Sequence, residues 1–137
     1  MQTPIAAKPL YVDSSALLQR VLNGSDAGAI DAATDQRTAS GGRVMSSRLL
    51  WLETRRVEIR ELLAGRDIRI PLREALATLD QLPVTEEVWQ RAAAIDCHVK
   101  TLDSLHLATC LLAEADLLAA DSQLRAAATS LGLRVLP

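Results

Sequence analysis

Short apolar runs alternate with longer amphipathic stretches along the chain, and this pattern predicts alternating strands and helices. Strands are expected at residues 10–12, 43–45, 82–84, 117–120 and 133–136. Helices are expected at residues 16–23, 25–38, 47–64, 72–79, 85–95, 102–115 and 122–131. This alternation favours an α/β fold with a mainly parallel central sheet covered by helices, and such sheets bind ligands beyond the carboxyl ends of their strands.

Hydroxyl residues before the helices and glycines after them mark the expected helix ends. The expected caps are Ser14 or Ser15, Ser46 or Ser47, and Thr101. The expected stops are Gly24, Gly65 and Gly132.

Length and composition fit one soluble domain spanning residues 1–137, because no repeat, low-complexity tract or linker divides the chain. Apolar runs reach only about four residues, far short of a membrane span. Two cysteines, Cys97 and Cys110, are too few for a disulfide framework, so a cytoplasmic protein is expected. With only three aromatic residues and no Phe, base-stacking nucleic-acid modules are disfavoured.

Positive charge is concentrated in one block. Residues 37–73 contain nine arginines against four acids, a net charge of +5, while the rest of the chain carries −7. A solvated helix surface explains such a block on arginine count alone. Arginine also recognises phosphate well, because its planar guanidinium is always charged and binds in a bidentate way, so the block is also a candidate polyanion-binding face.

Two aspartates follow expected strands directly, Asp13 after residues 10–12 and Asp121 after residues 117–120. In a parallel sheet both emerge at the same edge, side by side if the two strands are neighbours. Each aspartate taken alone is also an ordinary helix cap.

Two further acids stand in unusual positions. Glu53 shares its expected helix face with Leu49, Leu50 and Val57, and a carboxylate on an inward face needs a partner. The alternative is a partly exposed position at the edge of that face. Asp103 lies in the first turn of its expected helix, where the helix dipole favours an anion.

Together these four acids suggest a divalent metal site. Clustered carboxylates raise one another's pKa unless a cation compensates, and an all-oxygen ligand set selects Mg²⁺ or Mn²⁺. Such ions beside an arginine-rich face suit phosphodiester hydrolysis. The alternative is a structural zinc site, whose candidate ligands are Cys97, His98, His106 and Cys110. Their spacing does not match a known zinc-binding motif. His106 and Cys110 also lie on the same helix face as Leu102 and Ala113, as buried core residues would.

Several stretches, spread over nearly the whole chain and in the same order, resemble the PIN-domain family, and within it the VapC-type toxins of toxin–antitoxin pairs. They are Tyr11–Leu17 (YVDSSAL), Ser46–Glu53 (SSRLLWLE), Leu102–Ala108 (LDSLHLA) and Ala115–Leu124 (ADLLAADSQL). The resemblance implies a three-layer α/β/α fold and a metal-dependent ribonuclease that uses Mg²⁺ or Mn²⁺. The family's acidic site corresponds to Asp13, Glu53, Asp103 and Asp121, with the Ser15 hydroxyl supporting it.

The resemblance also implies partners. A small antitoxin is expected to cover the acidic site, with helices 16–30 and 49–63 as candidate contacts, and relatives commonly form homodimers. Arg48, Arg55 and Arg56, close to Glu53 in sequence, are candidate contacts to RNA phosphates. One departure is Ala119, where relatives often carry Thr or Ser before the last acid. Asp116 matches a common family position but is interpreted as a strand-start residue outside the metal site.

Other functions fit the sequence less well. A receiver domain needs a lysine at a strand end, and Lys100 precedes a helix here; a haloacid-dehalogenase-like phosphatase needs Asp-x-Asp, where this chain has Asp13-Ser14-Ser15. No glycine-rich phosphate loop occurs. A catalytically inactive PIN-like scaffold that binds proteins is the remaining alternative, and its signature would be loss of one or more of the four acids.

Overall fold

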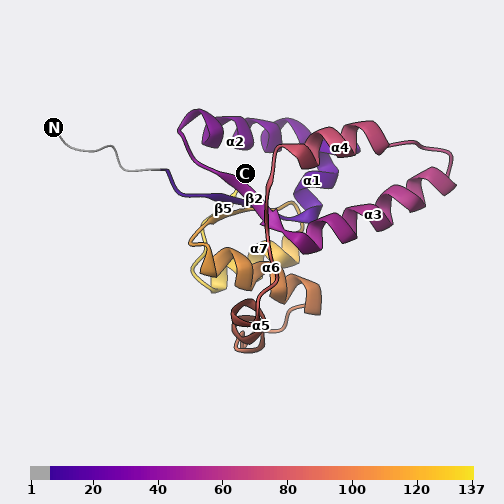
Figure 1. Ribbon diagram of the computed structural model, residues 1–137. Helices are drawn as coiled ribbons and strands as arrows, with labels where there is room; N and C mark the ends of the chain where they lie inside the picture. The colour runs from indigo at the N-terminus through magenta and orange to yellow at the C-terminus, as the bar shows by residue number, and fades with distance from the viewer. Residues whose placement is uncertain (1–6) are drawn as a thin grey trace.

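Within residues 7–137, five short strands form one sheet, which lies at the centre of the molecule (Figure 1). The structure is a computed structural model and describes residues 7–137. The strands are β1 (Leu10–Val12), β2 (Val44–Ser47), β3 (Asp80–Leu82), β4 (Asp116–Leu118) and β5 (Val135–Leu136). They lie in the order β3-β2-β1-β4-β5, and every neighbouring pair is parallel, which confirms the expected parallel sheet.

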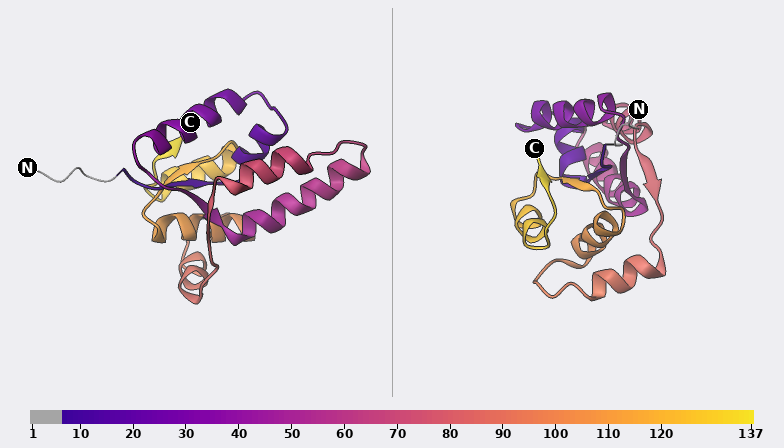
Figure 2. Two further views of the ribbon diagram at one scale, coloured as in Figure 1. Left: turned by 45° about the horizontal axis from the view of Figure 1, so that its top comes forward. Right: turned by 90° about the vertical axis from the view of Figure 1, so that its left-hand side faces the viewer.

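Helices cover both faces of the sheet and complete the expected three layers (Figures 1 and 2). Helices α1 to α4 lie on one side, and α6 and α7 lie on the other, with α5 packed against α6. Their bounds are α1 Ser14–Val21, α2 Ala27–Ala39, α3 Arg48–Leu63, α4 Arg69–Ala77, α5 Glu86–Ala93, α6 Thr101–Leu112 and α7 Ser122–Ser130.

The alternation of side chains along β1 divides the core in two. Leu10 and Val12 point into the cluster that holds residues of α1 to α4, whereas Tyr11 between them points into the cluster formed with α6 and α7. Because successive side chains of a strand face opposite sides of a sheet, this short central strand contributes to both layers. All three residues are fully buried.

The helix ends agree with the sequence in part. Ser47 caps α3 as expected, and Gly65 and Gly132 have positive φ just after α3 and α7. Three expectations are wrong. Asp13, not a serine, caps α1; Lys100 takes the cap position of α6 without a side-chain bond; and the left-handed residue after α1 is Asn23, not Gly24. Asp caps a helix as well as Ser does, and Asn adopts the left-handed conformation more readily than most other residues with a side chain.

Three elements lie nearer the amino terminus than expected, and the first is α1, which spans residues 14–21 instead of 16–23. β3 begins at Asp80, two residues before the expected strand, and α4 begins at Arg69 instead of Leu72. β3 is an edge strand whose Asp80 and Gln81 side chains are exposed, so backbone pairing with β2 places it and no apolar pattern marks it. Pro71 falls at the third position of α4, where its missing N–H removes no helical hydrogen bond.

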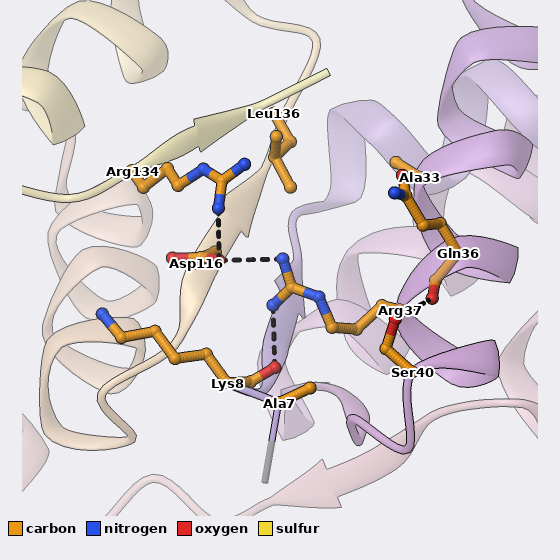
Figure 3. A pocket seen from close by; sticks show the side chains of 9 residues that line it. All are labelled: Ala7, Lys8, Ala33, Gln36, Arg37, Ser40, Asp116, Arg134 and Leu136. Atoms are coloured by element: carbon orange, nitrogen blue, oxygen red, sulfur yellow. Dashed lines mark hydrogen bonds and ion pairs between the residues drawn. The ribbon is translucent and has the colours of Figure 1, made fainter. Parts of the chain in front are cut away.

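A buried ion pair occupies the amino-terminal end of the strands. Arg37 on α2 donates to Asp116 at the start of β4 over 2.8 Å and to the carbonyls of Lys8 and Pro9. Asp116 is buried, and Arg134 lies 3.9 Å away from it. These groups line a pocket of about 330 Å³ (Figure 3). Asp116 is thus a structural residue remote from the carboxyl ends of the strands, consistent with its interpretation from sequence.

No helix among residues 7–137 is both long and apolar enough to span a membrane.

Replacing Arg37 tests the importance of this ion pair. Arg37→Met should lower the free energy of unfolding by about 3 kcal/mol, because it leaves the buried Asp116 carboxylate without its main partner. Arg43→Met breaks the exposed pair with Asp80 and should cost about 1 kcal/mol or less. Urea unfolding measures both values, and equal losses in the two variants would contradict a dominant role for the buried pair.

Candidate active site

Asp13 and Asp121 emerge side by side from the carboxyl ends of neighbouring strands. β1 pairs with β4 in a register that places Val12 opposite Leu118. The Asp13 N–H donates to the Leu118 carbonyl over 3.0 Å, which extends the pairing to the first acid. β1 and β4 also flank the point where the strand order reverses, the usual ligand site of such sheets.

The Ser15 hydroxyl connects the two aspartates. It donates to Oδ2 of Asp13 over 2.6 Å and accepts from the backbone N–H groups of Ala120 and Asp121 at 3.0 and 3.1 Å. The Ser15 N–H donates to the same Asp13 oxygen. Ser15 therefore fixes the Asp13 carboxylate and ties it to the loop that carries Asp121.

The second oxygen of Asp13 has no protein partner. Asp13 is 2% exposed, and its Oδ1 is buried without a hydrogen bond among the described residues. A buried, unpaired carboxylate oxygen is costly, so it calls for a cation or an ordered water. Asp121, by contrast, is exposed, and its Oδ1 accepts from the Leu124 N–H as the cap of α7.

Asp103 lies within electrostatic reach of both aspartates. It is half-buried in the first turn of α6. Desolvation and the negative charges of Asp13 and Asp121 raise the pKa of the Asp103 carboxyl, although His106 and Lys100 act in the opposite direction. The three acids therefore gather negative charge at one place, as expected from their sequence positions.

Glu53 reaches the same region from α3. Its Oε1 accepts a hydrogen bond from Nε2 of the buried His106 at 2.5 Å, and the Ser14 hydroxyl donates to its Oε2 at a longer 3.4 Å. The Glu53 side chain is 21% exposed, so it lies at the edge of the inward face rather than in the core. We call Asp13, Glu53, Asp103 and Asp121 the acidic edge.

His106 is held from its other side by Tyr11, whose hydroxyl lies 2.6 Å from Nδ1. Burial lowers the pKa of His106, but the hydrogen bond to Glu53 and the charges of Asp13, Glu53 and Asp103 outweigh it, so the pKa lies above its usual value. From the sequence, His106 is expected to be a core residue or a zinc ligand, and its contact with Glu53 is not predicted. The available signal was the unpaired Glu53 together with a histidine one helical turn after Asp103.

The donor set fits a hard divalent cation better than zinc. Among residues 7–137 no three His, Cys, Asp or Glu side chains stand close enough to form a ready-made metal cage. Mg²⁺ usually keeps several waters and takes only one or two protein carboxylates, so the free Oδ1 of Asp13 beside Asp103 fits its requirements. The zinc alternative loses support, because both His106 nitrogens are engaged and Cys110 donates to the Ala115 carbonyl.

The candidate RNA-binding arginines differ in their surroundings. Arg48, Arg55 and Arg56 are all exposed on α3. Arg55 forms an ion pair with Glu58 one turn along the helix, at 2.8 Å. Within the described part of the chain Arg48 and Arg56 form no ion pair, which leaves them the more available of the three.

Ala119, which departs from the family pattern, is fully buried, and its carbonyl accepts from Arg125 at 2.8 Å. The side chain that contacts the loop before Asp121 is Ser15 instead. The hydroxyl at this corner of the site therefore comes from α1.

Solved structures that share this fold include three from different organisms. PAE2754 from Pyrobaculum aerophilum is 19% identical with a TM-score of 0.66, and the match covers 94% of this chain and 84% of that one. A toxin–antitoxin complex from Klebsiella pneumoniae gives 20% identity, a TM-score of 0.59, and coverage of 85% and 88%. VapBC2 from Rickettsia felis, bound to a promoter DNA fragment, gives 8% identity, a TM-score of 0.65, and coverage of 92% and 96%. Identities this low establish a common fold alone.

A comparison with curated protein sequences finds no significant match. The family model described as PIN domain, however, matches residues 10–129, which include all four acids and Ser15. The chain therefore belongs to the PIN domain family, whose members are generally nucleases.

Proposed function

We propose that this protein is a metal-dependent ribonuclease and the toxin of a toxin–antitoxin pair, similar to VapC-type toxins. The observation that carries the proposal is the Asp13 carboxylate, which is buried and anchored through Oδ2 but has no partner for Oδ1. Asp103 and Asp121 add charge beside it. A divalent cation satisfies the free oxygen and offsets the repulsion at once.

Each residue of the acidic edge has a proposed task. Asp13 and Asp103 hold the principal Mg²⁺ or Mn²⁺ ion, and Asp121 and Glu53 contact it directly or through water. Ser15 keeps Asp13 from rotating, because its hydroxyl and N–H both donate to the same carboxylate oxygen. No covalent protein intermediate is required.

When bound, the ion supplies Lewis-acid chemistry, lowering the pKa of a water and neutralising charge on the phosphate. The chain itself positions the substrate. Arg48 and Arg56, exposed on the same helix as Glu53, bind RNA phosphates and place the strand without reading its sequence. Arg55 contributes less, because Glu58 already compensates its charge.

The proposed partner is a small antitoxin that covers the acidic edge. Two structures that share this fold are described as a toxin–antitoxin complex and as VapBC2, which supports this assignment. Apolar side chains exposed along or next to α1 and α3 suit a wrapping partner; they are Leu22, Leu52, Leu62 and Leu63. A homodimer is also expected from the family resemblance.

Removing an acid or the metal tests the activity. Asp13→Asn and Asp103→Asn should each reduce Mn²⁺-dependent cleavage of total RNA by at least about 100-fold, because loss of a ligand costs at least as much as loss of a residue that supports one. EDTA should abolish cleavage by the unaltered protein. Asp35→Asn, an exposed aspartate on α2, is the matched control and should leave cleavage unchanged.

Calorimetry with Mn²⁺ alone separates the nuclease from an inactive scaffold. The unaltered protein should bind Mn²⁺, and Asp13→Asn should bind it more weakly. Undiminished cleavage by folded Asp13→Asn, or no Mn²⁺ binding by the unaltered protein, would remove the proposed mechanism.

The acidic edge should also cost stability when no metal is present. The pKa of Asp103 is raised in the folded protein, so its contribution to stability is present below the unfolded value and is lost as pH rises through the folded value. In EDTA at pH 7, Asp103→Asn should therefore unfold at a higher temperature than the unaltered protein. The difference in unfolding temperature between the two proteins should become smaller as pH falls toward about 4, where the carboxyl in the unfolded chain becomes protonated. Circular dichroism melts measure this, and a lower midpoint for Asp103→Asn at pH 7 would contradict it.

Salt dependence tests the arginines. If Arg48 and Arg56 each neutralise one phosphate, Arg48→Gln and Arg56→Gln should each lower the slope of log affinity against log salt by about 0.7 for single-stranded RNA. Arg134→Gln removes an exposed arginine near the opposite end of the strands and is the control. The Asp13→Asn background allows binding to be measured without cleavage. Equal slopes for all variants would refute the assigned phosphate contacts.

A further inference from the structure

His106 is a fully buried imidazole with a polar partner at each nitrogen. Nε2 lies 2.5 Å from Oε1 of Glu53, and Nδ1 lies 2.6 Å from the Tyr11 hydroxyl. If His106 only filled space in the core, an apolar side chain could replace it without the loss of any hydrogen bond. Here both nitrogens are used, which connects β1, α6 and α3 through side chains alone.

Glu53 and Tyr11 together fix the direction of these hydrogen bonds. A carboxylate can only accept, so the ring hydrogen of a neutral imidazole lies on Nε2 and Nδ1 is the acceptor. The Tyr11 hydroxyl, which accepts from the Ser47 N–H over 3.2 Å and stays protonated because burial raises its pKa, then donates to Nδ1. In a protonated ring Nε2 carries hydrogen as well, so His106 donates to Glu53 in either state.

Glu53 depends on this donor for its orientation. Among the described residues its only other side-chain hydrogen bond is the one from Ser14, at 3.4 Å. A partly exposed glutamate otherwise samples several rotamers, and fixing it in one rotamer costs side-chain entropy. The buried ring of His106 cannot move freely, because Tyr11 holds its far side.

The same helix also carries Asp103, one turn before His106. Any shift of α6 therefore moves Asp103 and the donor to Glu53 together. This couples the acid at the start of α6 to the acid on α3, although the two residues are far apart in sequence and share no backbone pairing.

We propose that His106 is a positioning residue that holds the Glu53 carboxylate toward the metal site, with Tyr11 bracing the ring. This inference rests on the proposed nuclease function and assigns His106 no contact with substrate. It adds the buried residues Tyr11 and His106 to the four acids.

Two variants of His106 separate positioning from packing. Glutamine is long enough to place an amide N–H near Nε2, whereas asparagine reaches only the position of Nδ1. His106→Gln should therefore keep Mn²⁺-dependent cleavage of total RNA within about threefold, and His106→Asn should lose about 10- to 100-fold, the usual range for a residue that orients a metal ligand. Mn²⁺ affinity measured by calorimetry should follow the same order.

A double variant of His106 and Glu53 distinguishes a positioning role of His106 from a role in core packing alone. In the Glu53→Gln background, His106→Asn should have almost no further effect on cleavage, because its target carboxylate is already gone.

Tyr11→Phe keeps the buried ring, removes only the hydroxyl and should reduce cleavage by about 10-fold. It keeps the inference testable if His106→Asn does not fold. Thr109→Val changes another buried polar residue of α6 and should leave cleavage unchanged.

Failure of the positioning role and failure of the nuclease function give different results. Equal activity of the glutamine and asparagine variants, or additive losses in the double variant, would overturn the inference while leaving the nuclease intact. Absence of Mn²⁺-dependent cleavage in the unaltered protein would instead refute the proposed function, and with it any positioning role. Full activity of Tyr11→Phe would overturn the bracing role assigned to the hydroxyl.

Discussion

The parallel pairing of β1 with β4 is the constraint on which the site depends. The two strands come from opposite ends of the chain, yet their register places Asp13 beside the residues that lead to Asp121. Because the sheet is parallel, both acids leave it at the same edge. The Ser15 hydroxyl then fixes the distance between them by bonding to one carboxylate and to the backbone of the other. A different strand order would scatter the same residues.

The buried carboxylates at the two ends of these strands differ in whether a cationic side chain neutralises them. At the amino-terminal end, the buried Asp116 is neutralised by Arg37, so the pair is part of the scaffold. At the carboxyl end, Asp13 is equally buried but has an unpaired oxygen, and its neighbours include further acids. A fold selected for stability alone would compensate both carboxylates. Under the proposed function, the uncompensated carboxylate is the place where stability is exchanged for metal binding.

The position of His106 depends on the direction in which the side chains of β1 point. The alternation of side chains in β1 turns Tyr11 toward α6, while Leu10 and Val12 pack against the other layer. Tyr11 therefore meets a ring that reaches Glu53 on α3. A single buried strand residue thus influences the position of an acid that belongs to another element.

Local patterns in the sequence were enough to predict the order of strands and helices and the parallel sheet. They also led to the prediction of the four acids, from two aspartates that directly follow strands, one acid on an inward helix face and one in a first helical turn. The sequence also indicated that Glu53 needs a partner. It missed the start of β3, since an edge strand with exposed side chains has no apolar signature. It did not separate Arg55 from Arg48 and Arg56, although Glu58 follows Arg55 by three residues on the same helix, a spacing that sequence can reveal. It also did not identify His106 as the partner of Glu53, because the two residues come from distant segments and their contact depends on how α3 and α6 pack.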